Sequence, residues 1–151
     1  MDPAIKPYTS AETLEIAEGI AVKILLTGDD TGGAIAVFED IVAPDTGPPR
    51  HIHHLQDETF FFLEGHFDVE IEGALHHFGP GDTAFVPKGS VHAFKNVGSA
   101  PGCLRYTFNP ALRIEEMFRA LHFAFMGDGF DEGAAAALAA EHGQEMAGPP
   151  L

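Results

Sequence analysis

GDTAFVPKGSVHAFKN, residues 81–96, is the most informative stretch of the sequence. Proline fixes φ, and glycine permits conformations that residues with a Cβ avoid, so Pro87 and Gly89 bracket a predicted turn. The turn leads into a predicted strand in which His92 and Asn96 share one face. We expect Asn96 to hold a turn or a strand end, because its amide can both donate to and accept from the backbone.

A histidine pair and a carboxylate lie upstream of this stretch. His51 and His53 are separated by one residue, so on a strand both side chains point the same way. Neutral imidazole is the commonest metal ligand in proteins, and Glu58, which opens the next predicted strand, can return a carboxylate oxygen to the same point. With His92, the set can hold one divalent metal ion. Residue identity does not choose among iron, manganese, nickel, copper and zinc.

Together the two stretches resemble the paired motifs of the cupin family. Residues 47–65 resemble the first motif, residues 81–96 resemble the second, and the interval between them is short, as in compact single-domain bacterial cupins. The segment from Gly47 to His51 is shorter than the plant-type spacing, which disfavours a germin-like protein. The resemblance implies an all-β fold, a double-stranded β-helix or jelly roll. By the same resemblance, the metal ligands are His51, His53, Glu58 and His92.

Short predicted strands, separated by Gly, Pro and Asp turns, fill the region that the motifs occupy. The clearest is His66–Glu72, where hydrophobic and polar residues alternate as in a half-buried strand. The other predicted strands are Ile20–Leu26, Ala34–Val42, Glu58–Leu63, Thr83–Val86, Val91–Val97 and Cys103–Phe108. On the last of these strands, the two-residue alternation does not show which face points inward. One face carries Arg105 and Thr107, and the other carries Leu104, Tyr106 and Phe108.

The hydrophobic period becomes helical after Asn109-Pro110. One helix is predicted across Leu112 to Phe125, and a second begins after an N-cap at Asp131 and stops near Gly143. We therefore predict a single cupin domain over residues 1–151, with the barrel at about 13–108 and a C-terminal helical extension at about 111–143. These helices look like those of small cupins similar to quercetin dioxygenases.

Aromatic residues continue the face on which the predicted ligands lie. Phe60 and Phe62 follow Glu58 at two-residue spacing, and Phe94 follows His92 in the same way. We predict that these three phenylalanines wall a substrate pocket beside the metal ion. Glu58 can also act as a catalytic base if it stays partly detached from the ion.

The opposite face of the same strand is apolar as well, because Phe61 and Leu63 lie there. A strand that is apolar on both faces is usually covered on both faces. A second sheet, the C-terminal helices or another copy of the chain would supply that cover. We favour another copy and predict a homodimer.

The charge and composition limit the partners of the chain. Its formal net charge is −15, so a nucleic acid or an anionic membrane surface would be repelled. The chain has no apolar run long enough to span a membrane. The first residues lack a signal-peptide pattern, and Cys103 is the single cysteine, so we expect a cytoplasmic location. The predicted partner is a small-molecule ligand.

Three imidazoles and one carboxylate leave two positions free on an octahedral ion. We therefore expect a metal-dependent dioxygenase whose substrate chelates the ion, such as an aromatic diol, a flavonol or an enolate-like molecule. A metal-assisted isomerase, lyase or epimerase is the alternative, with Glu58 moving the proton. A non-enzymatic module that binds a small molecule is the third interpretation. The fold alone does not separate these, because one scaffold carries many chemistries.

Overall fold

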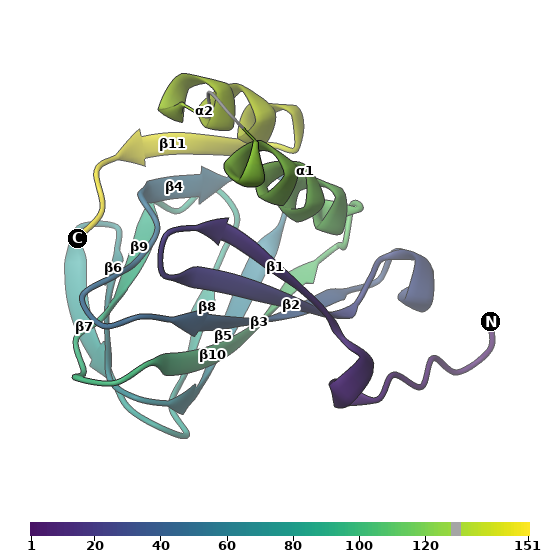
Figure 1. The fold of residues 1–151 in the computed structure, drawn as a ribbon, viewed down its shortest axis with the longest axis horizontal. Helices are drawn as coiled ribbons and strands as arrows, with labels where there is room; N and C mark the ends of the chain where they lie inside the picture. The colour runs from purple at the N-terminus through teal and green to yellow at the C-terminus, as the bar shows by residue number, and fades with distance from the viewer. Residues whose placement is uncertain (128–130) are drawn as a thin grey trace.

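Two antiparallel sheets face each other in the computed structural model, which describes residues 1–127 and 131–151 (Figure 1). The first sheet has the order β1 (Glu12–Ala17), β2 (Ile20–Leu26), β3 (Ala36–Val42), β10 (Gly102–Asn109), β5 (Asp57–Glu64) and β8 (Thr83–Val86). The second has the order β11 (Gln144–Gly148), β4 (Arg50–His53), β9 (His92–Asn96), β6 (Phe67–Ile71) and β7 (Ala74–Phe78). The predicted all-β jelly roll is confirmed.

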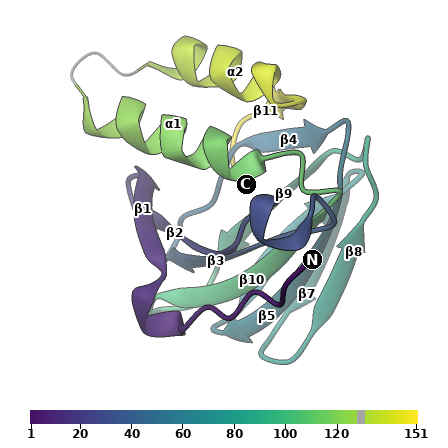
Figure 2. The ribbon, with the colours of Figure 1, turned by 90° about the vertical axis from the view of Figure 1, so that its right-hand side faces the viewer.

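Two helices follow the barrel strands. Helix α1 (Ile114–Met126) packs against β1, and α2 (Glu132–Glu141) packs against β11. Figure 2 shows both helices at one end of the barrel, on the same side as β4 and β11. Asp131 is the N-cap of α2, as predicted, because its side chain accepts a hydrogen bond of 2.7 Å from the amide of Ala134. No helix in the described part of the chain is long and apolar enough to cross a membrane.

Strand β11 is a difference from the sequence prediction, which ended the folded elements near Gly143. Its residues have little of the β-branched and aromatic character that marks a strand. The strand forms instead because it pairs with β4, with Gln144 opposite His53 and Met146 opposite His51. The C-terminal segment thus becomes an edge of the second sheet.

The barrel interior is filled by alternate residues of both sheets. On β10 the inward face carries Leu104, Tyr106 and Phe108, which are almost fully buried. The structure thus shows which face of this strand points inward, a question that the sequence left open. The side chains of these three residues pack with the inward residues of the neighbouring strands β3 and β5. The two sheets therefore share one hydrophobic core.

A close backbone approach joins the two sequence motifs. A Cβ on Gly47 would lie 1.8 Å from the carbonyl oxygen of Phe94, so only glycine fits there. Next to it, the amide of Asn96 donates to Thr46, and its side-chain nitrogen donates to the carbonyls of Val42 and Ala100. Asn96 therefore ties several chain segments together, which agrees with its predicted anchoring role.

The outer face of the first sheet keeps exposed apolar side chains. Phe61 and Leu63 are each 39% exposed, and the helices pack elsewhere, on β1 and β11. Cover by another copy of the chain therefore stays a prediction.

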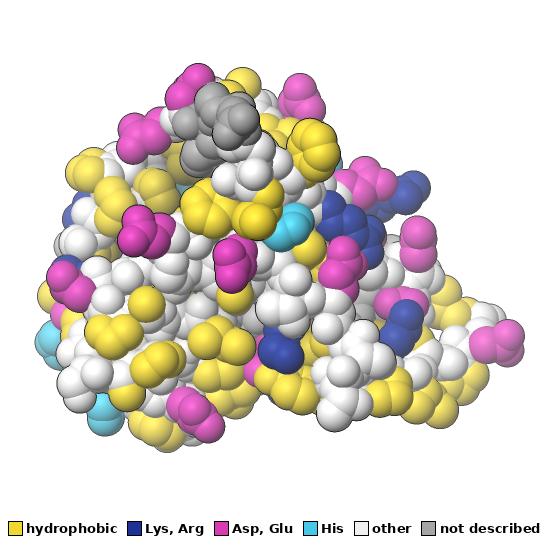
Figure 3. All heavy atoms as spheres, viewed as in Figure 1, with side chains coloured by type: hydrophobic (Ala, Val, Ile, Leu, Met, Phe, Trp, Pro, Cys, Tyr) yellow, Lys and Arg dark blue, Asp and Glu magenta, His cyan; other side chains and the backbone are white. Residues whose placement is uncertain are grey.

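Acidic side chains are spread over the whole face shown in Figure 3 and do not gather in one patch.

Candidate metal centre

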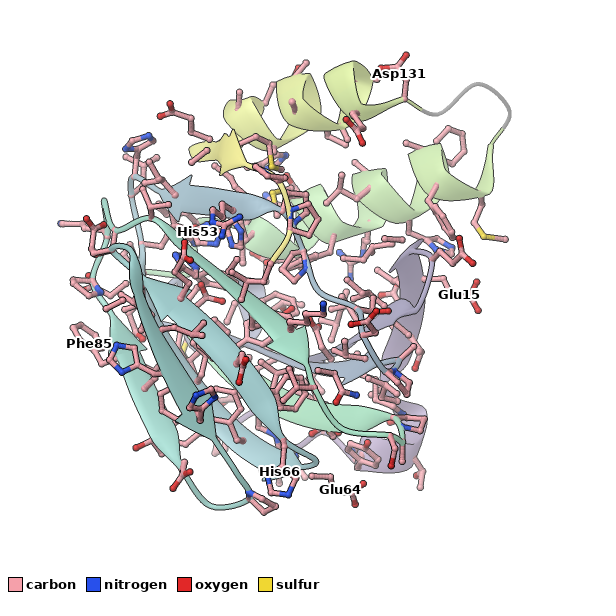
Figure 4. The ribbon with its side chains drawn as sticks, turned by 90° about the vertical axis from the view of Figure 1, so that its left-hand side faces the viewer. Glu15, His53, Glu64, His66, Phe85 and Asp131 are labelled. Carbon is pink, nitrogen blue, oxygen red and sulfur yellow. The ribbon has the colours of Figure 1, made fainter. Side chains whose placement is uncertain are left out.

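Three strands bring the four predicted ligands together inside the barrel. His51 and His53 come from β4, His92 from β9 and Glu58 from β5, and one ligand atom from each lies within 4.8 Å of all the others. Figure 4 shows His53 at the end of the barrel nearest the helices, whereas His66 and Glu64 lie at the opposite end. All four ligand residues are at most 7% exposed. A buried group of three imidazoles and a carboxylate can hold a metal ion.

Two of the imidazoles are oriented by the backbone. His51 and His92 face each other across the β4–β9 pairing, with ring centroids 4.4 Å apart. Nδ1 of His51 lies 2.8 Å from the carbonyl oxygen of Pro49, and Nδ1 of His92 lies 3.0 Å from that of Ser90. Because a carbonyl only accepts, both Nδ1 atoms donate, so Nε2 is the nitrogen of each ring that can bind a metal ion.

Glu58 reaches the imidazoles from the opposite sheet. Its Oε2 lies 2.9 Å from Nε2 of His92 and 3.4 Å from Nε2 of His53. Burial raises the pKa of Glu58, although the contact with His92 opposes that effect. Burial also disfavours charge on His92, but the hydrogen bond and the negative charge of Glu58 outweigh it and raise the pKa of His92. When no ion is bound, the two side chains form a hydrogen bond of 2.9 Å between Nε2 and Oε2, and a bound ion would take the place of its proton.

The other two histidines are held neutral. Burial lowers the pKa of His51 to about 3, helped by the neighbouring His92. Burial likewise lowers the pKa of His53 well below its ordinary value, and His51 and His92 add to the effect. Neutral imidazole is the form that binds metals, so these two side chains are ready to bind an ion throughout the neutral pH range.

The predicted turn of the second motif supports a ligand of the first. Gly89 has a φ of 86°, a conformation that favours glycine. Its amide donates a hydrogen bond of 2.8 Å to the carbonyl oxygen of His53. The turn therefore fixes the end of β4 at the same time as it starts the strand that bears His92.

The three predicted pocket residues are buried in the barrel interior, and Phe60 lies nearest to a ligand. The ring centroid of Phe60 is 6.1 Å from that of His92, and the centroid of Phe94 is 6.1 Å from that of Phe60. Phe62 stacks on Phe78, with centroids 4.6 Å apart, on the side of Phe60 away from the site. All three are at most 5% exposed. Their contact with a substrate stays a prediction.

Sequence reasoning missed two further groups in the interior. Phe108 packs against a ligand, because its ring centroid lies 4.8 Å from that of His53. Asp40 and Tyr106 form a buried pair in which the phenol donates a hydrogen bond of 2.8 Å to the carboxyl group. Asp40 lies between Phe38 and Val42 on the inward face of β3, and a carboxyl group among such neighbours was the signal available in the sequence.

Replacing Asp40 by asparagine is expected to flatten the pH dependence of stability. Burial raises the pKa of Asp40 from 3.8 to about 8, with Glu58 and Glu39 adding to the shift and Tyr106 opposing it. The unfolded chain loses this proton at lower pH than the folded chain, so the group's stabilising contribution falls as pH rises from about 4 to about 8. From about pH 5 to about pH 7 it lowers the free energy of unfolding by about 1 kcal/mol per pH unit.

Urea unfolding of the metal-free protein across this pH range measures the effect. The wild-type protein should lose stability relative to Asp40→Asn as the pH rises. Because Glu58 is present in both proteins, the difference between the two curves reports Asp40 together with its interaction with Glu58. Parallel curves would show that Asp40 ionises in the fold as it does in water.

Comparisons with known proteins agree with this geometry. The family described as "Cupin domain" matches residues 38–107, which include all four ligands. An uncharacterized protein of Aquifex aeolicus (strain VF5) is 38% identical over 50% of this chain and 61% of that protein. Quercetin 2,3-dioxygenase of Bacillus subtilis (strain 168) is 30% identical over 60% of this chain and 33% of that enzyme. The chain thus spans less than two thirds of either relative.

Solved structures share the fold at low sequence identity. KdgF from Halomonas sp. has a TM-score of 0.66 and 18% identity, covering 72% of this chain and 94% of that one. A sugar phosphate isomerase from Silicibacter pomeroyi has a TM-score of 0.61 and 24% identity, covering 70% and 75%. The polyketide cyclase RemF from Streptomyces resistomycificus has a TM-score of 0.61 and 21% identity, covering 72% and 80%. With its paired motifs, its jelly-roll strands and its buried ligand set, the part of the chain that the family model matches, residues 38–107, is a cupin domain.

Proposed function

We propose that the protein is a metal-dependent dioxygenase that acts on a small organic substrate with adjacent oxygen donors. The buried set of three histidines and one glutamate carries this proposal, because its ligand atoms converge within 4.8 Å of one another. Similarity to quercetin 2,3-dioxygenase over 60% of the chain supports it. Aromatic diols, flavonols and enolate-like molecules fit the same chemistry, since each presents two oxygens to one metal ion.

A bound Fe(II), Mn(II) or Ni(II) ion would be held by the three histidines and Glu58, and it would supply two further positions, either for both oxygens of a chelating substrate or for one substrate oxygen and dioxygen. The chain itself supplies the orientation and the surroundings of the site. The carbonyls of Pro49 and Ser90 hold two imidazoles in place, and Phe60 and Phe108 exclude water beside the ligands. Glu58 can accept a proton from a substrate hydroxyl, because burial raises the pKa of its carboxyl group.

Oxygen uptake tests the proposal directly. Protein loaded anaerobically with Fe(II), Mn(II) or Ni(II) is mixed with a catechol, a flavonol or a diketone, and dioxygen consumption is followed together with product mass in labelled dioxygen. We expect uptake that depends on substrate and that falls by about 100-fold or more in His92→Ala, because that variant loses a ligand. His54→Ala is the matched control, since its ring is exposed and pairs with Glu145 on the outer face.

A metal-assisted isomerase, lyase or epimerase is the second candidate. Glu58 favours it, because its Oε2 is hydrogen-bonded to Nε2 of His92 at 2.9 Å and lies 3.4 Å from Nε2 of His53, so a proton can move between the carboxyl group and an imidazole. Turnover without dioxygen consumption in the same assay would establish this function in place of the first. Tight substrate binding without any turnover would identify a binding module.

The remaining predictions extend this proposal. A homodimer would cover Phe61 and Leu63, whose outward side chains this chain leaves exposed. The cytoplasmic location expected from the single cysteine also stays a prediction.

A further inference from the structure

The imidazole of His53 differs from the other two in its outward nitrogen. Nδ1 of His51 and Nδ1 of His92 each bond to a backbone carbonyl two residues earlier in the chain. Nδ1 of His53 is buried and has no hydrogen-bond partner among the residues that the structure describes. When Nε2 of a neutral histidine faces a metal ion, Nδ1 carries the proton and needs an acceptor. A buried donor without an acceptor costs about 1–3 kcal/mol, so the site calls for one.

The C-terminal strand places a residue with a side-chain acceptor opposite His53. Gln144 is the direct cross-strand partner of His53 in the β4–β11 pairing, so both side chains lie on the same face of the sheet. Its Oε1 is likewise buried and forms no hydrogen bond with any described residue, His53 included. The alternation along the strand agrees, because Glu145 faces outward and pairs with His54. Unpaired buried polar atoms are uncommon, and here an unmatched donor and an unmatched acceptor occupy adjacent positions.

We infer that Gln144 is a positioning residue for the metal site. Its Oε1 accepts the Nδ1–H of His53 through one buried water, or directly once the side-chain amide turns towards the imidazole, and so directs Nε2 of His53 towards Glu58 and the ion. The distance between directly opposed Cβ atoms in an antiparallel pair, about 5 Å, suits either arrangement. The inference rests on the proposed metal site and does not depend on which reaction the site performs. It extends the site to β11, outside both sequence motifs.

Metal affinity and histidine tautomer together test the assignment. Gln144→Leu removes the acceptor at similar volume, and Gln144→Glu keeps one. Met146→Leu is the matched control, because Met146 is the next inward residue of β11 and carries no such acceptor. Affinities for Co(II) are measured by competition with a chromophoric chelator. The tautomer of His53 in the metal-free proteins is read from nitrogen NMR of the imidazole, and the stability of each metal-free protein from urea unfolding.

We expect Gln144→Leu to weaken Co(II) binding by about 10- to 100-fold, the range typical of partners that orient a metal ligand. Gln144→Glu and Met146→Leu should stay close to the wild type. In metal-free Gln144→Leu, the His53 imidazole should become a mixture of tautomers, whereas the wild type should carry its proton on Nδ1. A purely structural role for Gln144 would lower stability without moving the tautomer.

Two results would overturn the inference, and they differ from a failure of the metal site. Binding by Gln144→Leu within about twofold of the wild type would show that Gln144 does not position His53. So would a loss of affinity that Met146→Leu shares in proportion to its loss of stability. If the wild type itself bound no Co(II), or His53→Ala bound it equally well, the metal centre would be wrong and this inference would fall with it.

Discussion

His53→Ala and His92→Ala are expected to contain no more metal than the background, whereas the wild-type protein should carry close to one ion per chain. Each substitution removes a ligand whose side chain is at most 4% exposed, so bulk solvent does not readily replace it. The remaining ligands form an incomplete set with much weaker binding. Elemental mass spectrometry on protein purified without chelator or nickel affinity resin measures the content.

His54→Ala controls for this experiment, because His54 neighbours a ligand in sequence but is half exposed and pairs with Glu145. It should keep the wild-type metal content. Iron, manganese, nickel or copper lost from both ligand variants would support the dioxygenase. Zinc alone would favour the isomerase or the binding module, and metal retained in both variants would refute the ligand assignment.

Gly47→Ala is expected to destabilise the protein by about 4 kcal/mol or more, within the range reserved for severe backbone conflicts. The added Cβ would lie 1.8 Å from the carbonyl oxygen of Phe94 and 3.1 Å from Cα of Lys95. Both contacts are with backbone, so no side-chain rotation relieves them. The loop would have to move away from β9 and break the hydrogen bonds that Asp45 and Thr46 make with Asn96.

Urea unfolding measures this loss, with Gly79→Ala as the control. A Cβ on Gly79 would meet its nearest neighbour, an atom of the His66 ring, at 3.4 Å, which is an ordinary contact. The control should stay within about 1 kcal/mol of the wild type. Insolubility of Gly47→Ala beside a soluble control also agrees with the expectation. Equal stability of the two variants would contradict the close approach.

The strands and the ligand set could be predicted because both depend on local spacing. Ile20–Leu26 and Thr83–Val86 coincide with β2 and β8, where turn residues bound the apolar runs clearly. The ligands follow from two-residue alternation on β4 and from the Pro87–Gly89 turn. Helix α1 begins at Ile114, not at Leu112, because Leu112 and Arg113 have positive φ and lie in the preceding loop.

The missed features depend on partners that are distant in sequence. Gln144 becomes relevant only through its register against His53, and nothing near Gln144 in the chain indicates that pairing. Asp40 and Tyr106 are 66 residues apart, so their hydrogen bond needs the β3–β10 pairing to be known first. Spacing rules describe one strand at a time, and these contacts arise between strands.

The second sheet is joined very unevenly along its width. Strand β9 pairs with β6 over five registered positions, but it meets β4 only at His51 opposite His92. The β4–β9 pairing is therefore the weakest main-chain connection in the sheet, and it lies between His51 and His53 on one side and His92 on the other. Side-chain ligands from both sides of this pairing, with Glu58 from the facing sheet, supply the connection that the backbone lacks there.

A bound ion would hold β4 and β9 together where few main-chain pairs join them. Opening this pairing would separate β4, with β11 beside it, from β9, and would pull His51 and His53 away from His92. The closed state would then be favoured in proportion to how tightly the ion binds, since only the closed state offers the whole ligand set. Because the ligands are buried, the ion would escape no faster than this local opening allows. The residence time of the ion would thus report how often β4 separates locally from β9.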